Sequence, residues 1–168
     1  MAKTISATVA LSIQADLVDA LDLASATFPL RYSPAYPFAD GTGTNQAKNV
    51  FTDTRTLAAS ASENLDLSGT ALNDPMGSAL AFTKIKALMI RAAPGNTNDV
   101  LVGGHATAAL ATMFGDATDK VRVTPGGAVM FVSPTGYDVT ATTADLLTVA
   151  NSAGGTSVTY DVIVLGTT

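Results

Sequence analysis

The sequence predicts an all-β protein, an antiparallel β-sandwich of jelly-roll-like type with an extended N-terminal arm or loop. Two observations lead to this prediction. Short runs of β-branched and aromatic residues alternate with turn sequences over residues 121–165, and the odd-numbered residues from 5 to 13 are apolar while Thr and Ser separate most of them. Short strands with turns at this spacing are typical of a sandwich or barrel. The chain of 168 residues is long enough for one domain, residues 1–168, with its own core.

The first expected strand covers residues 4–13. Ile5, Val9 and Ile13 lie on the apolar side of a two-residue period, which is the pattern of a half-buried strand. Residues 16–23 fit a strand or irregular structure, because one pair of leucines has helical spacing and another has strand spacing.

Residues 24–48 are expected to form an extended arm or long loop. Pro29, Pro34 and Pro37 favour extended backbone over helix. Disordered segments are normally poor in aromatic residues, so we expect the arm to become ordered by placing its rings against its own sandwich or an adjacent subunit. The candidate partner-binding residues are the four aromatic residues of this segment, Phe28, Tyr32, Tyr36 and Phe38.

The middle of the chain is expected to supply edge strands and one central strand. Residues 49–58 and 65–68 have the mixed polar and apolar composition of two edge strands. Residues 80–92 carry apolar side chains on both faces, which indicates a central strand that is covered on both sides.

The remaining strands follow in the second half. Residues 106–114 are rich in alanine and could form a helical turn or two. Proline presets φ and glycine accepts a positive φ, so residues 124–127 and 133–136 are expected turns. The expected strands are residues 100–102, 121–123, 128–132, 137–140, 146–150 and 157–165.

Composition excludes several classes of function. Only 14% of the residues are charged and the net charge is −5, so the basic stripe that binds nucleic acid is missing. No run approaches the roughly 20 apolar residues that span a bilayer, and the N-terminus lacks the apolar core of a signal peptide. We therefore expect a protein made in a cytoplasm, with no nucleic-acid or membrane partner. The low charge suits a surface covered by neighbouring subunits.

No catalytic, metal or cofactor site is expected. His105 is the only imidazole of a chain without cysteine, whereas a zinc site needs three or four ligands. No serine lies in the Gly-x-Ser-x-Gly sequence of a nucleophile elbow. Asp116 and Asp119 lack the closing glutamate of a calcium loop and are expected to form a turn. The function is therefore expected to be non-enzymatic.

Eight segments resemble small structural proteins of tailed-bacteriophage virions, which are described as head-decoration or tail-associated proteins. These segments are GTGTNQA (41–47), FTDTRTLAAS (51–60), ENLDL (63–67), FTKIKAL (82–88), FGDATD (114–119), VTPGG (123–127), DLLTVANS (145–152) and VTYDVIVLG (158–166). The resemblance covers most of the chain after residue 40, and none of the segments is catalytic. It implies, by analogy, a β-sandwich or jelly roll that binds a symmetric protein shell or tube.

On this resemblance, the expected function is that of a capsid cement or decoration protein in the virion. Such a protein binds between major capsid subunits and stabilises the shell, as a homotrimer where the junction has threefold symmetry. Phe28, Tyr32, Tyr36 and Phe38 would anchor it to the major capsid protein or another virion protein. A tail or head-fibre component of the same virion is the first alternative. The second, from another class, is a carbohydrate-binding module, which would need a row of exposed aromatic residues on a sheet.

Overall fold

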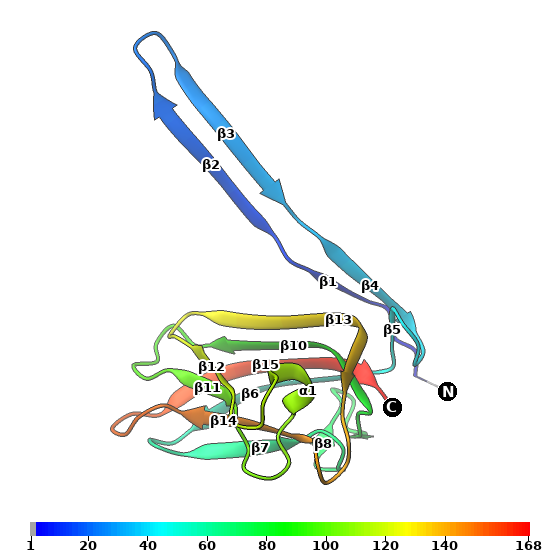
Figure 1. Ribbon diagram of the computed structural model, residues 1–168. Helices are drawn as coiled ribbons and strands as arrows, with labels where there is room; N and C mark the ends of the chain where they lie inside the picture. Colours follow the sequence, from blue (N-terminus) through cyan, green and yellow to red (C-terminus); the bar gives the residue numbers. More distant parts are fainter. Residues whose placement is uncertain (1–2) are drawn as a thin grey trace.

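Two four-stranded antiparallel sheets pack face to face, and a long β-ribbon projects away from them (Figure 1). The computed structural model describes residues 3–168. The first sheet, here the arm-side sheet, has the strand order β13 (Ala128–Asp138), β10 (Lys84–Ala92), β15 (Val158–Thr167) and β6 (Asn49–Leu57). The second, here the far sheet, has the order β12 (Lys120–Val123), β11 (Val100–Gly103), β14 (Leu146–Asn151) and β7 (Ser62–Asp66). The predicted antiparallel β-sandwich is confirmed.

The eight sandwich strands pair in the nested order of a jelly roll. The first strand pairs with the last, the second with the seventh, the third with the sixth and the fourth with the fifth: β6 with β15, β7 with β14, β10 with β13, and β11 with β12. Two further antiparallel pairs, β10 with β15 and β11 with β14, complete the sheets. This is the double Greek-key connection of the jelly roll.

The main core fills the space between the two sheets. Alternate residues of β15 point into it, and Tyr160 and Val162 are fully buried while Ile163 between Val162 and Val164 points to solvent. This alternation follows from the two-residue period of a strand. β10 lies between β13 and β15, which confirms a central strand for residues 84–92 of the expected 80–92, whereas Leu80 belongs to β9. β6 and β7 end their sheets, which confirms the edge strand expected at residues 49–58, while the second edge strand covers residues 62–66 rather than the expected 65–68.

Two small elements close the sandwich. β8 (Leu72–Asn73) and β9 (Ala79–Leu80) form a short antiparallel pair. The helix α1 (Ala111–Phe114) is a single turn that buries Met113, and it lies inside the stretch where a helical turn was predicted.

The predicted turn at residues 133–136 is wrong, because β13 continues through it. Ala87 of β10 pairs with Val132 and Ile85 pairs with Tyr137, so four residues of β13 lie opposite one residue of β10. Gly136, with φ of 90°, supplies the positive φ that this wide bulge needs. Proline and glycine are found in bulges as well as in turns, because a bulge and a turn both leave backbone positions without a cross-strand hydrogen bond.

The N-terminal part forms one long antiparallel ribbon, which we call the arm (residues 7–40). Its strands are β1 (Ala7–Ala10), β2 (Ile13–Ala20), β3 (Ser25–Tyr32) and β4 (Ala35–Asp40). The register does not shift along it, since Ala7 pairs with Phe38 and Ala20 pairs with Ser25.

The expectation of an arm or loop at residues 24–48 needs a correction. This segment contains β3 and β4, which form only one strand of the arm, while residues 7–20 form the other. The short β5 (Gln46–Ala47) then pairs in parallel with β4. The single strand expected at residues 4–13 likewise extends, after a break at Leu11 and Ser12, into β2.

Candidate interaction site

The arm has one apolar and one polar face. Residues that pair directly in an antiparallel ribbon point to the same face, and successive pairs alternate. The apolar face of the distal half carries the pairs Ile13–Tyr32, Ala15–Leu30 and Leu17–Phe28, followed toward the tip by Asp19–Ala26. The polar face carries the pairs Gln14–Arg31, Asp16–Pro29, Val18–Thr27 and Ala20–Ser25. The same alternation places Val9, Tyr36, Ala7 and Phe38 on the apolar face nearer the base.

An ion pair supports the polar face. The Arg31 guanidinium donates to the Asp16 carboxylate at 2.7 Å and to the backbone carbonyls of Ala15 and Leu30 at 2.9 and 2.8 Å. Both charged side chains are half exposed, so the pair contributes at most about 1 kcal/mol. The polar groups of this face thus have partners within the arm or in solvent.

The proximal half of the apolar face packs on the arm-side sheet. Phe38 is only 2% exposed, and Ile5, Val9 and Tyr36 are partly buried around it. They cover one row of outward side chains that crosses all four strands of the sheet. This row consists of Val132, Ala87, Leu165 and Val50. A second, smaller apolar core therefore fixes the base of the arm to the sandwich.

The distal half of the same face has no cover. Five large apolar side chains are 41 to 72% exposed: Ile13, Leu17, Phe28, Leu30 and Tyr32. Beyond them, Leu21 and Leu23 are exposed at the tip, where the Leu21 amide donates to the Ala24 carbonyl at 2.9 Å. Figure 1 shows β2 and β3 extending clear of both sheets. The distal half of the arm therefore carries a contiguous strip of exposed apolar side chains.

The prolines make the two edges of the arm different. The Leu11 amide donates to the Pro34 carbonyl at 3.1 Å, and hydrogen-bonded pairs alternate with non-bonded pairs along a ribbon. Pro29 and Pro37 therefore occupy non-bonded positions, where their nitrogens face outward. They block the β3–β4 edge against another strand, whereas the β1–β2 edge carries no proline.

A buried lysine ties the arm to the bulge of β13. The Lys86 ammonium donates to the carbonyls of Gly43, Pro134 and Thr135 at 3.0, 3.0 and 2.8 Å. Gly43 lies in the loop after β4, and the Asn45 amide of that loop also donates to the Pro134 carbonyl at 3.1 Å. Lys86 is fully buried, and this burial lowers its pKa. The lysine holds the base of the arm in place.

An open groove runs beside the base of the arm. Its floor is the next outward row of the arm-side sheet, where Met89 pairs with both Met130 and Ile163. Residues 7–10 of β1 form one wall, and the groove has a volume of about 360 Å³. The following row is polar, since Arg91 and Asp161 form an ion pair at 3.5 Å. The groove is thus an apolar strip that continues the row already covered by the arm.

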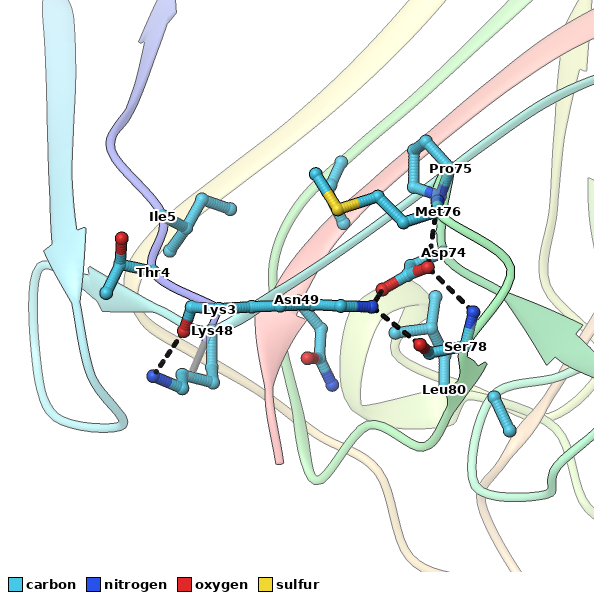
Figure 2. A pocket seen from close by; sticks show the side chains of 12 residues that line it. Lys3, Thr4, Ile5, Lys48, Asn49, Asp74, Pro75, Met76, Ser78 and Leu80 are labelled. Carbon is cyan, nitrogen blue, oxygen red and sulfur yellow. Dashed lines mark hydrogen bonds and ion pairs between the residues drawn. The ribbon is translucent and has the colours of Figure 1, made fainter. Parts of the chain in front are cut away.

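A second hollow of about 430 Å³ lies between the start of the chain and the β8–β9 pair. Figure 2 shows the Lys3 ammonium reaching across it to the Asp74 carboxylate and to the Ser78 hydroxyl, which is 2.6 Å away. The Lys3 ammonium and the backbone amides of Ser78 and Met76 lower the pKa of Asp74. These contacts fasten the N-terminal segment to the sandwich.

The residues considered for chemistry serve local structure. His105 Nδ1 accepts from the backbone amides of Thr107 and Ala108 at 3.3 and 3.1 Å. The Asp119 carboxylate accepts from the Asp116 amide at 3.0 Å, within their own turn. Within residues 3–168, no three His, Cys, Asp or Glu side chains gather as a metal site would require. The described part of the chain also contains no helix with the length and apolar character to cross a membrane.

The structure divides the four predicted anchors into two pairs. Tyr36 and Phe38 pack against the chain's own sheet, while Phe28 and Tyr32 lie on the exposed distal half. The prediction missed Ile13, Leu17 and Leu30, which complete the exposed face. Apolar side chains at odd-numbered positions continue from residue 5 to Leu17, and this pattern was the signal for Ile13 and Leu17. No family model matches the chain, and no curated protein matches it.

Proposed function

We propose that this chain is a structural protein of a virion, of the capsid cement or decoration type, which uses its arm as a connector between subunits. The observation that carries the proposal is the exposed distal face of the arm. It presents five large apolar side chains on an ordered ribbon. Rigid aromatic groups that are already in position lose little conformational entropy on docking.

The fold and the resemblance support the same proposal. Jelly rolls recur in viral capsid and lectin domains, although a fold by itself does not specify a function. The segment that resembles virion proteins at residues 41–47 contains Gly43, whose carbonyl accepts from Lys86 at the base of the arm. The resemblance at residues 41–47 therefore falls on a segment that holds the base of the arm, and not on a catalytic group.

The mechanism would be mass action on an assembled shell. A protein that binds the assembled shell more tightly than free subunits stabilises the shell by that difference in affinity. The proposed partner is the major capsid protein or another virion protein, and a homotrimer would match a threefold junction. Many identical contacts of moderate strength then act together.

A tail or head-fibre component of the same virion is the alternative, since the same arm could attach the chain there. A carbohydrate-binding module has less support. The exposed aromatic residues of the described chain, Phe28 and Tyr32, lie on the arm, whereas Tyr160 is buried and Tyr137 packs against the core. A sugar-binding sheet would carry such rings on its outer face.

Quantitative mass spectrometry of intact virions and of heads stripped of tails tests the proposal. We expect the chain in tail-free heads, in a fixed ratio to the major capsid protein. Its presence in tails alone would support the alternative instead. Its absence from purified particles would overturn the virion proposal, and glycan binding that survives loss of the arm would then favour the carbohydrate-binding reading.

A further inference from the structure

We propose that the distal apolar face of the arm docks on the arm-side sheet of a second copy of this chain, in the groove floored by Met89, Met130 and Ile163. The inference concerns association of the purified protein with itself. It goes beyond the proposed virion role and does not require that role.

Continuity with the covered part of the sheet is the first argument. The proximal half of the arm already packs its apolar face on the row that contains Ala87 and Leu165. The groove floor is the adjacent row, since Met89 and Ile163 each lie two residues along the same strands. The distal half presents the same kind of side chains on the same face. The distal half of the arm and the groove floor are therefore the same two kinds of surface that pack together at the base of the arm.

The chain's own arm leaves this groove open. β1 borders the groove on one side, and β2 and β3 then leave the sandwich (Figure 1). Ile163 remains 39% exposed on the groove floor, and Leu17 remains 72% exposed on the arm. An arm from a second copy can cover the groove, and the same contact would bury the exposed apolar face of that arm.

The backbone of β1 favours an extended occupant. β1 pairs only with β4 among the described strands, and Thr8 and Ala10 occupy the non-bonded positions whose backbone groups face outward. Both residues line the groove. An incoming arm presents a proline-free β2 edge next to its apolar face, so it can bond to β1 and cover the methionine row together.

The dimensions agree with this arrangement. Residues 13–17 of an extended strand span roughly 13 Å at about 3.3 Å per residue, and the three strands of the groove floor, at about 4.8 Å spacing, span roughly 10 Å between backbones. Two reciprocal arm–groove contacts would cover the five exposed apolar side chains of each arm.

Substitutions on adjacent residues of one strand test the arm. Leu17→Asp places a charge on the apolar face, and Val18→Asp places the same charge on the polar face, where Val18 is 60% exposed. We expect the wild-type chain to have at least twice its monomer mass of 17.0 kDa by light scattering. Leu17→Asp should weaken association by about tenfold or more, and Val18→Asp should not change it. Equal circular dichroism spectra of all variants would verify that they are folded.

A second pair of substitutions tests the groove. Ile163→Asp charges its floor, while Thr56→Asp charges an exposed position on the same sheet face outside it. Ile163→Asp should dissociate the protein like Leu17→Asp, and Thr56→Asp should behave like the wild type. A monomeric wild type would overturn the inference. So would an Ile163→Asp protein that stays associated while Leu17→Asp dissociates, because the arms would then contact each other instead.

Cross-linking tests the contact between arm and groove by capturing it, whereas the substitutions above test it by weakening association. The chain contains no cysteine, so a Leu17→Cys chain can be mixed with a Met89→Cys chain that carries a size tag. We expect a disulfide-linked heterodimer under mild oxidation, and far less product when Val18→Cys replaces Leu17→Cys. Equal yields from the two mixtures would contradict the proposed orientation. If the chain were absent from purified virions, the association and cross-linking results would still stand, because both use the purified protein alone.

Discussion

Phe38 and Phe28 belong to the same face of one ribbon whose pairing register does not shift, yet Phe38 is 2% exposed and Phe28 is 65% exposed. Phe38 packs in one cluster with Ala87 and Leu165 of the sandwich. Phe28 sits ten residues earlier, at a position of the same parity in the pairing register, where β3 has left both sheets (Figure 1). The arm thus repeats, beyond the edge of its own sandwich, the surface that it uses to pack on that sandwich.

This contrast predicts opposite effects for two equivalent substitutions. In a monomeric Leu17→Asp background, Phe38→Ala should lower the free energy of unfolding by about 3–5 kcal/mol, because it empties a buried site. Phe28→Ala should change it by no more than about 0.5 kcal/mol, since that ring is exposed. Urea titration measures both. Similar losses from both substitutions would show that the distal face is part of the folded core.

Removing the buried ammonium should loosen the base of the arm. Lys86→Met leaves the three carbonyls of Gly43, Pro134 and Thr135 without this donor, and we expect a loss of about 1–3 kcal/mol in the free energy of unfolding. Hydrogen exchange of the Asn45 amide should become faster. Lys84→Met, on the same strand but half exposed, is the matched control and should change the stability by no more than about 0.5 kcal/mol. Equal effects from the two lysines would contradict the role given to Lys86.

The pH dependence of stability should report on Tyr160. Its hydroxyl donates to Glu63 Oε1 at 2.7 Å, and Arg55 donates to the other oxygen of that carboxylate at 2.5 Å. Burial, then the contact with Glu63, raise the pKa of Tyr160. The fold therefore favours the neutral phenol, and the free energy of unfolding should fall as the pH rises above about 10, the value for an unfolded tyrosine.

Tyr160→Phe is the variant that isolates this effect. It should cost about 1 kcal/mol near neutral pH through the lost hydrogen bond, and the wild-type advantage should shrink as the pH rises above about 10. Urea titrations at several alkaline pH values give the difference between the two proteins. An advantage that stays constant across that range would contradict the proposed coupling.

The prolines of the β3–β4 edge should limit uncontrolled association. Pro29→Val restores an outward backbone amide on that edge and is expected to increase aggregation on storage. Thr27→Val, on the same strand and face, keeps Pro29 and adds similar apolar surface, so it should aggregate less. Light scattering over time compares the two. More aggregation from Thr27→Val would indicate that apolar surface, rather than the open edge, controls this process.

Local patterns in the sequence predicted much of the sandwich. The alternation of polar Thr159 and Asp161 with Tyr160 and Val162 indicates which residues face the core. The two-sided apolar run at residues 80–92 predicts a central strand, of which residues 84–92 form β10. The pairing of residues 7–20 with residues 25–38 was not predictable in this way, because the partners of a strand are set by contacts distant in the sequence. Three prolines in β3, β4 and their junction favoured a loop, although two of them occupy positions where no ladder bond is lost.

Local sequence patterns also could not predict the contacts that hold the arm to the sandwich. Lys86 lies between apolar neighbours, and a single lysine in a strand usually points to solvent. Only the bulge at residues 133–136 and the loop around Gly43 create the three carbonyls that receive it. The bulge itself has the composition of a turn. Both features depend on segments that meet only in the folded chain.

The central claim is that the apolar face of the arm contacts another protein chain while the polar face does not. Single cysteines at positions 17 and 18 test it most directly, because the chain has none of its own and the two positions lie on opposite faces. In associated protein or in intact particles, we expect slow alkylation of Leu17→Cys and fast alkylation of Val18→Cys, and similar rates for both after dilution to monomers. Equally fast alkylation of both positions under all of these conditions would contradict the claim.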